Sequence, residues 1–242
     1  TVCCSMVLVV VIAKLIGSML PMLAKKIGII YDSSDVYSTG IYTNFKSTAA
    51  EKGIEIVSEE AFTADSNTDF SVQLQAAKDA GADLMFLPFY YQQAAIVLKQ
   101  AKDMDFAPLF WGVDGMDGIL TLENFDTTLA EGVILLTPFA ADAKDDLTVN
   151  FVTKYQEAYN EIPNQFAADA YDAVYVIKAA IEKSGVTCDM SVEEIGTALK
   201  AAMTQISVDG LTGDSMTWAP SGEVSKGPKA VVIKDGVYVS MD

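Results

Sequence analysis

The amino-acid sequence predicts an α/β protein built on a doubly wound parallel sheet. Two observations lead to this prediction. Short apolar runs alternate with amphipathic helical stretches between residues 26 and 137. These runs are continuously apolar, which is typical of strands that helices bury on both faces. The chain has 242 residues, 51% of them hydrophobic, so it is long enough to form a sizeable core.

The expected strands are short runs rich in β-branched and other apolar residues. The first of them, Ile27–Tyr31, ends in the polar loop 32–35. In chain order, we expect strands at 27–31, 54–58, 83–87, 109–112 and 133–137, and further β-type segments at 211–218 and 229–240.

The expected helices lie between these strands and then dominate the chain from residue 145. Helix 38–52 places Ile41, Phe45 and Ala49 on one face, and Gly53 ends it. Another expected helix begins after Asp69, which caps it, and ends at Gly81. The remaining expected helices are 92–104, 145–160, 163–184 and 191–203. The last three follow one another without a strand, which indicates a change of architecture.

The first 26 residues differ from the rest of the chain. They hold three lysines and no acid, whereas the remainder holds thirteen lysines and 33 acids. As a membrane span the segment is marginal, because Lys14 near its middle costs about 2.5–3.5 kcal/mol. As a signal peptide it lacks a positive region before the apolar run. Two alternatives stay open: an export or anchor segment, or a buried strand at 6–12 followed by a helix at 14–24.

Charge and composition exclude several classes of function. A formal charge of −17 argues against nucleic acid as a partner, because neutralising phosphates needs a basic surface. The sequence has no histidine and no arginine, which excludes His-based triads, His-ligated zinc and arginine phosphate clamps. Cys3, Cys4 and Cys188 are too few and too badly spaced for a disulfide framework or a structural metal site. We therefore expect a binding protein without metal or cofactor, and not an enzyme.

Candidate binding residues follow several of the predicted strands. Tyr37 comes after the first strand, Tyr90 after the third, and Asp114, between two glycines, after the fourth. Because open parallel sheets bind ligands at the carboxyl ends of their strands, these side chains should share one rim. Rings and a carboxylate suit a small ligand with an apolar body and a cationic group. Each of these residues also has a simpler interpretation that involves no ligand. Tyr37 would pack at the start of a helix, Tyr90 would be an aromatic residue at the rim, and Asp114 would cap the next turn.

The sequence also resembles a known family. The segments 25–32 (KKIGIIYD) and 35–40 (DVYSTG) are similar to type I periplasmic solute-binding proteins, in the leucine/isoleucine/valine-binding branch that serves amino-acid ABC importers. Further similar segments, in the family's order and spacing, are 68–74, 81–88, 90–91, 112–115, 130–133 and 167–174. The likeness extends from about Lys25 to the end of the chain.

The resemblance implies a clamp of two lobes that closes on a free amino acid. Asp114 matches the acidic residue that pairs with the α-ammonium group of the ligand. Tyr37 and Tyr90 match tyrosines that contact the ligand's side chain, and Phe166 matches an aromatic residue that opens a returning helix.

The resemblance also implies a division of the chain. Residues 27–138 and 208–242 would form one complete, Rossmann-like ligand-binding lobe, and 139–207 a helical segment that returns to the other lobe. Hinges would lie near Pro138–Ala141 and Ser207–Gly210. The other lobe is reduced to helices plus the apolar segment 1–26, a remnant or an anchor. We therefore expect weakened ligand affinity and an exposed apolar surface that favours self-association.

The predicted function is that of the extracytoplasmic solute-binding component of an ABC transporter, periplasmic or membrane-associated at the cell surface. It would bind a branched-chain or other apolar amino acid and present it to the membrane subunits of the permease. One alternative is the ligand-binding sensor domain of a membrane receptor. A less favoured one is a doubly wound enzyme that uses Asp32 or Asp35.

Overall fold

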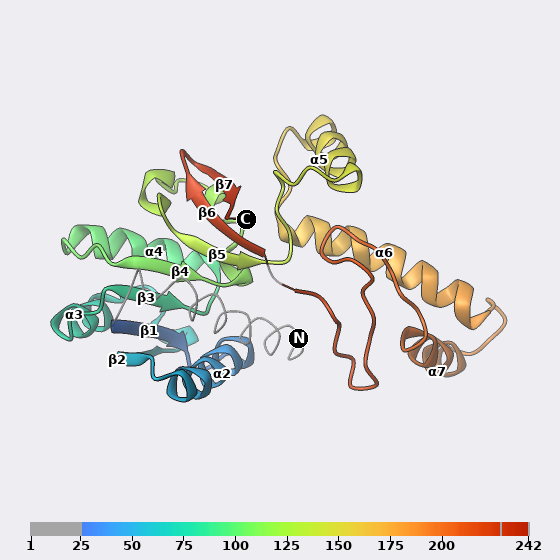
Figure 1. Ribbon diagram of the computed structural model, residues 1–242, viewed down its shortest axis with the longest axis horizontal. Helices are drawn as coiled ribbons and strands as arrows, with labels where there is room; N and C mark the ends of the chain where they lie inside the picture. Colours follow the sequence, from blue (N-terminus) through green and yellow to red (C-terminus); the bar gives the residue numbers. More distant parts are fainter. Residues whose placement is uncertain (1–25, 228, 242) are drawn as a thin grey trace. The chain divides into compact units, whose positions relative to one another are not determined.

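The computed structural model describes residues 26–227 and 229–241, which divide into two compact units (Figure 1). The first unit contains the described residues up to Ala140 and those from 229 onward, and the second is Ala141–Gly227. Residues 208–227 thus belong with the helices of the second unit, whereas the sequence-based division grouped them with the first lobe. The expectations for residues 1–24 lie outside the described residues.

A seven-stranded sheet forms the first unit, with the strand order β2-β1-β3-β4-β5-β6-β7. The strands are β1 (Lys26–Asp32), β2 (Glu55–Phe62), β3 (Leu84–Leu87), β4 (Leu109–Gly112), β5 (Ile134–Thr137), β6 (Lys229–Lys234) and β7 (Val237–Ser240). The pairs among β1 to β5 are parallel, which confirms the predicted fold class. The last two strands are antiparallel additions. Asp235 and Gly236, both with positive φ, form the tight turn that joins them.

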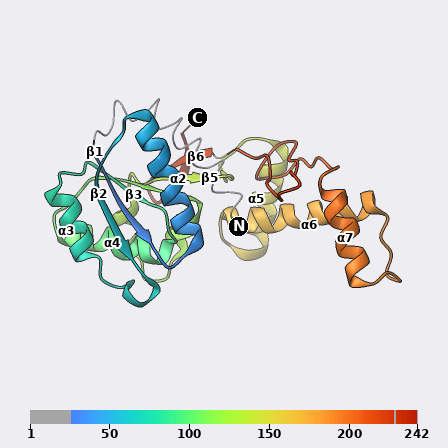
Figure 2. The ribbon, with the colours of Figure 1, turned by 90° about the horizontal axis from the view of Figure 1, so that it is seen from below.

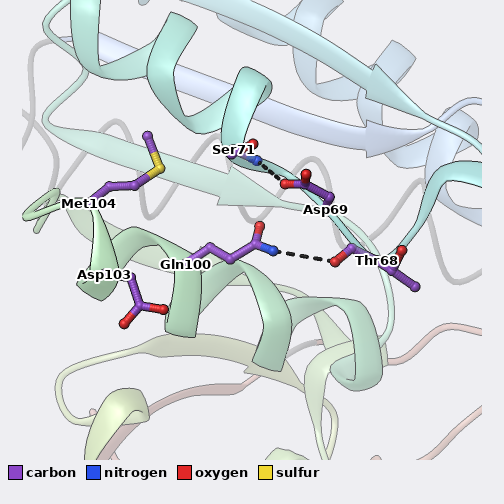
Figure 3. A pocket seen from close by; sticks show the side chains of 6 residues that line it. All are labelled: Thr68, Asp69, Ser71, Gln100, Asp103 and Met104. Atoms are coloured by element: carbon purple, nitrogen blue, oxygen red, sulfur yellow. Dashed lines mark hydrogen bonds between the residues drawn. The ribbon is translucent and has the colours of Figure 1, made fainter.

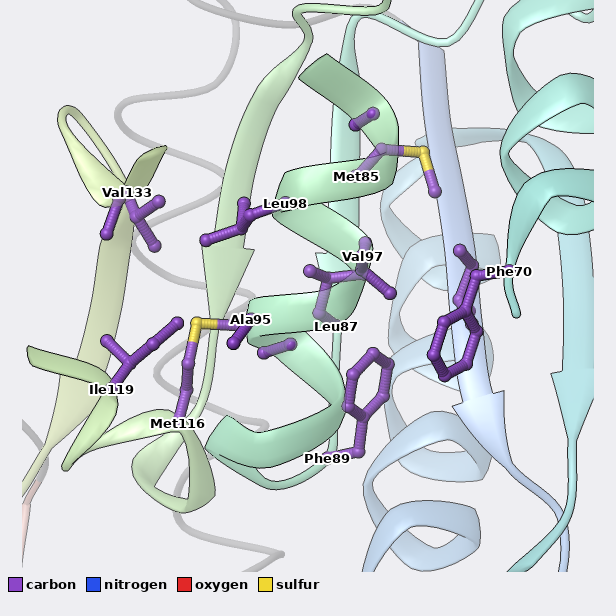
Figure 4. Close-up of a cluster of buried hydrophobic side chains, with 14 of the residues drawn as sticks. Phe70, Met85, Leu87, Phe89, Ala95, Val97, Leu98, Met116, Ile119 and Val133 are labelled. Carbon is purple, nitrogen blue, oxygen red and sulfur yellow. The ribbon is translucent and has the colours of Figure 1, made fainter. Parts of the chain in front are cut away.

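Helices cover both faces of the sheet (Figure 2). Helix α2 (Val36–Lys52) packs on one face, and α3 (Ser71–Asp79) and α4 (Tyr91–Asp103) pack on the other. Within β3, Leu84 and Phe86 join the cluster under α2. Met85 and Leu87 join the larger cluster under α3 and α4 (Figure 4). Because consecutive side chains point to opposite faces, a strand covered on both sides is apolar throughout.

The second unit consists of three helices and a long loop. The helices are α5 (Asp146–Tyr159), α6 (Gln165–Ser184) and α7 (Val192–Met203). Their N-caps, Asp145, Asn164 and Ser191, each accept a hydrogen bond from a backbone N–H in the first turn, which fixes where each helix begins.

The loop after α7 differs from the prediction of a β-type segment at 211–218. It forms only isolated bridges, Val208 with Met216 and Trp218 with Val224. The N–H groups of Leu211 and Thr212 donate to the Asp172 carboxylate instead, both at 2.8 Å. A side chain on α6 therefore takes the donors that a neighbouring strand would need.

A candidate ligand site at the carboxyl ends of the strands

The strand order places a topological switch point between β1 and β3. The chain leaves β1 for α2 on one face of the sheet and leaves β3 for α4 on the other. Open α/β sheets bind ligands where the connections diverge in this way. Tyr37 lies in the first turn of α2, and Tyr90 is the N-cap residue of α4. The two tyrosines therefore flank the switch point.

Three of the four predicted site residues lie together at this rim. The Tyr37 hydroxyl donates a hydrogen bond to the Asp114 carboxylate and accepts one from the Gly115 N–H at 2.9 Å. The rings of Tyr37 and Tyr90 stack with their centroids 5.1 Å apart. The proximity expected from the sheet is present, and the role of these residues in ligand binding stays a prediction.

Gly115 allows this close arrangement. A Cβ atom at this position would lie 2.8 Å from the Tyr37 hydroxyl oxygen and 3.2 Å from Cδ1 of Tyr90. Both distances are tighter than ordinary carbon contacts, so a side chain would push the rings away. The sequence indicated a glycine-flanked aspartate, but the spacing alone did not reveal that Gly115 packs on both rings.

Two aspartates hold the loop that presents Tyr37. The side chain of Asp35 accepts hydrogen bonds from the N–H groups of Tyr37 at 3.3 Å and Ser38 at 3.4 Å, which caps α2. The Asp32 carboxylate accepts from the Ser34 N–H at 2.8 Å and from its hydroxyl at 2.6 Å. Sequence analysis missed this capping, although an aspartate just before a helix is a known signal for it. These contacts give both aspartates a structural role.

Burial and negative charge keep the two phenols protonated. Burial, and then the neighbouring Asp114, raises the pKa of Tyr37 well above its ordinary value of 10.0. Burial also raises the pKa of Tyr90, with further contributions from Asp35 and Asp114. A carboxylate framed by neutral aromatic rings attracts a cationic group more readily than an anion.

Phe166, the fourth predicted site residue, lies in the second unit. It is the second residue of α6, and its side chain is 42% exposed. Its assignment to the site therefore rests on the resemblance alone.

Two cavities occur elsewhere on the first unit. One, of about 460 Å³, is lined by Thr68, Asp69, Ser71, Gln100, Asp103 and Met104 (Figure 3). Gln100 accepts a hydrogen bond from the Phe70 N–H at 2.7 Å and donates to the Thr68 carbonyl at 3.3 Å, so its polar groups hold the loop before α3. The other, of about 550 Å³, lies between α4 and the loop 122–129. None of the four predicted site residues lines either cavity.

Over the part of the chain that the structure describes, no group of three or more metal-ligating side chains could hold a metal ion. Within the same residues, no helix is long and apolar enough to cross a membrane.

Comparison with known proteins decides the family. Residues 10–236 match the family described as periplasmic binding protein. The chain belongs to this family. Its relatives include the leucine-, isoleucine-, valine-, threonine- and alanine-binding protein of Pseudomonas aeruginosa, 28% identical over 180 residues, which are 73% of this chain and 46% of the relative. Another is the Leu/Ile/Val-binding protein homolog 3 of Brucella melitensis, 26% identical over 90% of this chain and 56% of the relative.

Solved structures share the fold of this periplasmic binding protein chain. The leucine binding protein LivK of Thermotoga maritima superposes with a TM-score of 0.82 at 23% identity, covering 97% of this chain and 64% of that one. The protein LivJ of Streptococcus pneumoniae, solved in complex with isoleucine, gives a TM-score of 0.79 at 22% identity, covering 98% of this chain and 65% of that one. This chain spans about half the length of the sequence relatives described above.

Proposed function

We propose that this chain acts as the extracytoplasmic solute-binding component of an ABC transporter and binds a free amino acid with an apolar side chain. Family membership supports an extracytoplasmic binding role, and the relatives named above are amino-acid-binding proteins. The names of these relatives describe binding proteins, and LivJ is described as the substrate binding protein of a transporter, which favours this function over the enzyme and receptor-sensor alternatives. Presentation of the bound amino acid to permease subunits is part of the proposal for the whole protein.

The observation that carries the proposal is the hydrogen bond between Tyr37 and Asp114. It fixes the carboxylate at the rim beside two neutral rings. An α-ammonium group bound to Asp114 would gain a charge-assisted hydrogen bond worth about 1.5–3 kcal/mol. An apolar ligand side chain packed on Tyr37 and Tyr90 would add about 25 cal/mol for each Å² of apolar surface removed from water.

Phe166 is the fourth residue of the proposal. The Phe166→Ala variant tests it directly: we expect weaker binding of apolar amino acids, with the preference for an ammonium group unchanged. Unchanged affinity for leucine would remove Phe166 from the site.

Calorimetric titration with leucine and valine tests the role of Asp114. In the Asp114→Asn variant, which keeps the shape of the side chain but removes its charge, affinity should fall roughly 10- to 150-fold. Asp103→Asn is the matched control, because it removes the same charge from an exposed ion pair on α4 of the same unit and does not touch the rim. Equal affinity in wild type and Asp114→Asn would exclude Asp114 from the site. An equal loss in both variants would show that the effect is not specific to Asp114.

A further inference from the structure

The loop after β4 carries the dipeptide Asp-Gly twice, at 114–115 and at 117–118. The first pair belongs to the candidate site, where the Tyr37 hydroxyl contacts both the Asp114 carboxylate and the Gly115 N–H. The second pair has no role in the site described above. A second tyrosine hydroxyl holds it in a similar way.

Tyr238, on β7, contacts the second pair. Its hydroxyl accepts a hydrogen bond from the Gly118 N–H at 3.2 Å and forms another with the side chain of Asp117. The Asp117 carboxylate also accepts from the Gly118 N–H at 2.8 Å. Because Asp117 is only 4% exposed, loss of these partners would leave a buried carboxylate short of hydrogen bonds, which is costly. Burial, and then the charge of Asp117, raises the pKa of Tyr238 above its ordinary value of 10.0, so the hydroxyl stays protonated and can donate.

The two pairs form one continuous turn of the backbone. Asp114–Met116 is a short 3-10 helix, and the Asp117 N–H donates to the Asp114 carbonyl at 3.0 Å. Met116, between the pairs, is buried in the larger cluster under α3 and α4 (Figure 4). Gly118 follows with φ at 101°, in the left-handed region that favours glycine. A displacement of the second pair would therefore move the backbone that presents Asp114.

The two tyrosines hold this turn from opposite faces of the sheet. Tyr37 packs against the hydrophobic cluster under α2, and Tyr238 packs against the cluster under α3 and α4. Tyr238 is itself anchored, because β7 pairs with β6 and the Asp235 N–H, in the turn between them, donates to Glu131 at 2.9 Å. A group that must meet a ligand in one orientation gains from supports of this kind, because they lower the cost of ordering it on binding.

We propose that Tyr238 and Asp117 are positioning residues of the amino-acid site, which hold the second Asp-Gly pair and thereby keep the Asp114 carboxylate at the rim. This role rests on the proposed function, because it concerns the same site. It extends the site by two residues beyond the four predicted ones. Both residues act through the loop and not by contact with the ligand.

The Tyr238→Phe variant tests this role, because it removes the hydroxyl and keeps the ring. The ligands are leucine and isocaproate, the analogue of leucine without the ammonium group. In calorimetric titrations, we expect the affinity for leucine to fall roughly 5- to 10-fold, while the affinity for isocaproate stays unchanged. A fold that was only less stable would lower both affinities together. Equal affinity for leucine in wild type and Tyr238→Phe, or an equal loss for both ligands, would overturn the proposal.

Two control variants separate positioning from the loss of any hydroxyl and from a loosened hairpin. Tyr42→Phe removes a hydroxyl of the same unit that donates to Glu59 at 2.6 Å. Glu131→Ala removes the contact that holds the turn between β6 and β7. Both should keep the affinity for leucine within about two-fold of wild type. A loss in either control as large as that in Tyr238→Phe would contradict the proposal.

Hydrogen exchange at the loop tests the same role without a ligand. The Gly115 N–H donates to Tyr37, so its exchange rate reports on the first Asp-Gly pair. In Tyr238→Phe we expect it to exchange at least about 5-fold faster than in wild type, together with the Gly118 N–H. Faster exchange confined to Gly118 would overturn the proposal, because the second pair would then not hold the first.

The failures of the two proposals can be told apart. If wild type binds leucine and isocaproate equally, the proposed function fails, and the positioning role fails with it. If wild type prefers leucine, and this preference is lost in Asp114→Asn but fully kept in Tyr238→Phe, only the positioning role fails.

Discussion

The two units of this chain are stabilised in different ways. The first unit buries both faces of its sheet under helices, with side chains such as Ile29, Phe70 and Met85 fully enclosed. The second unit leaves much of its apolar surface in solvent. Among the described residues, nine of the thirteen large apolar side chains that are exposed lie within Ala141–Gly227. The first unit thus encloses its apolar side chains between its sheet and helices, whereas the second exposes many of its apolar side chains along its helices.

A network of hydrogen bonds around Asp172 helps to stabilise the second unit. Besides two backbone N–H groups, the Asp172 carboxylate accepts the Thr212 hydroxyl at 2.7 Å, and it is buried. Gly210 packs so closely that a Cβ atom there would lie 2.6 Å from the carboxylate. Lys226 extends the network by donating to Asp169 at 2.9 Å and to the Thr212 hydroxyl oxygen at 3.2 Å.

The largest expected effect is that of Asp172→Ala. It leaves three buried donors without their charged acceptor, which should cost about 3 kcal/mol or more. Hydrogen exchange should show lost protection in 204–227 while β1 and β3 stay protected. Asp169→Asn on the same helix is the control: it breaks a partly exposed ion pair and should cost about 1 kcal/mol or less. If Asp172→Ala lowered protection equally in both units, the two units would not be stabilised in different ways.

Replacing a glycine by alanine should act in opposite directions in the two units. Gly115→Ala forces Tyr37 and Tyr90 apart, so it should destabilise the first unit by about 1–3 kcal/mol and weaken ligand binding. Gly196→Ala, within α7 and with no atom within 4 Å of the added Cβ, should stabilise the second unit by about 0.5–1 kcal/mol. Urea denaturation of each variant measures both effects. A stabilising Gly115→Ala would contradict the close packing at the rim.

We expect a smaller, pH-dependent effect on the free energy of unfolding from the Tyr37 hydroxyl. Because the pKa of Tyr37 is raised in the folded state, its contribution to stability is fully present below about pH 10, the pKa in the unfolded chain. It is lost as the pH rises from there through the higher pKa of the folded state. At neutral pH, Tyr37→Phe should cost about 0.5–1.5 kcal/mol for the lost hydrogen bond. The free energy of unfolding, measured by urea titration on both sides of pH 10, should fall less steeply with pH in Tyr37→Phe than in wild type. Identical slopes would exclude this linkage.

Much of the first unit could be predicted because its signals are local. The continuous apolar run of β3 indicates burial on both faces, and Gly53, with φ at 66°, ends α2 where the sequence placed its end. The rim could be predicted because parallel strands bring their carboxyl ends to one edge. The conformation of the loop 208–227 could not be predicted, because Asp172, which accepts its hydrogen bonds, lies about 40 residues earlier in the sequence. The contact of Gly115 with the two rings depends on side-chain packing that spacing does not encode.

Binding of leucine compared with isocaproate, which has the same carbon skeleton without the amino group, tests the central claim most directly. If Asp114 receives the ammonium group, calorimetry should show wild type binding leucine at least about 10-fold more tightly than isocaproate, and this preference should disappear in Asp114→Asn. Equal affinity of wild type for the two compounds, or a preference that survives in Asp114→Asn, would contradict the account.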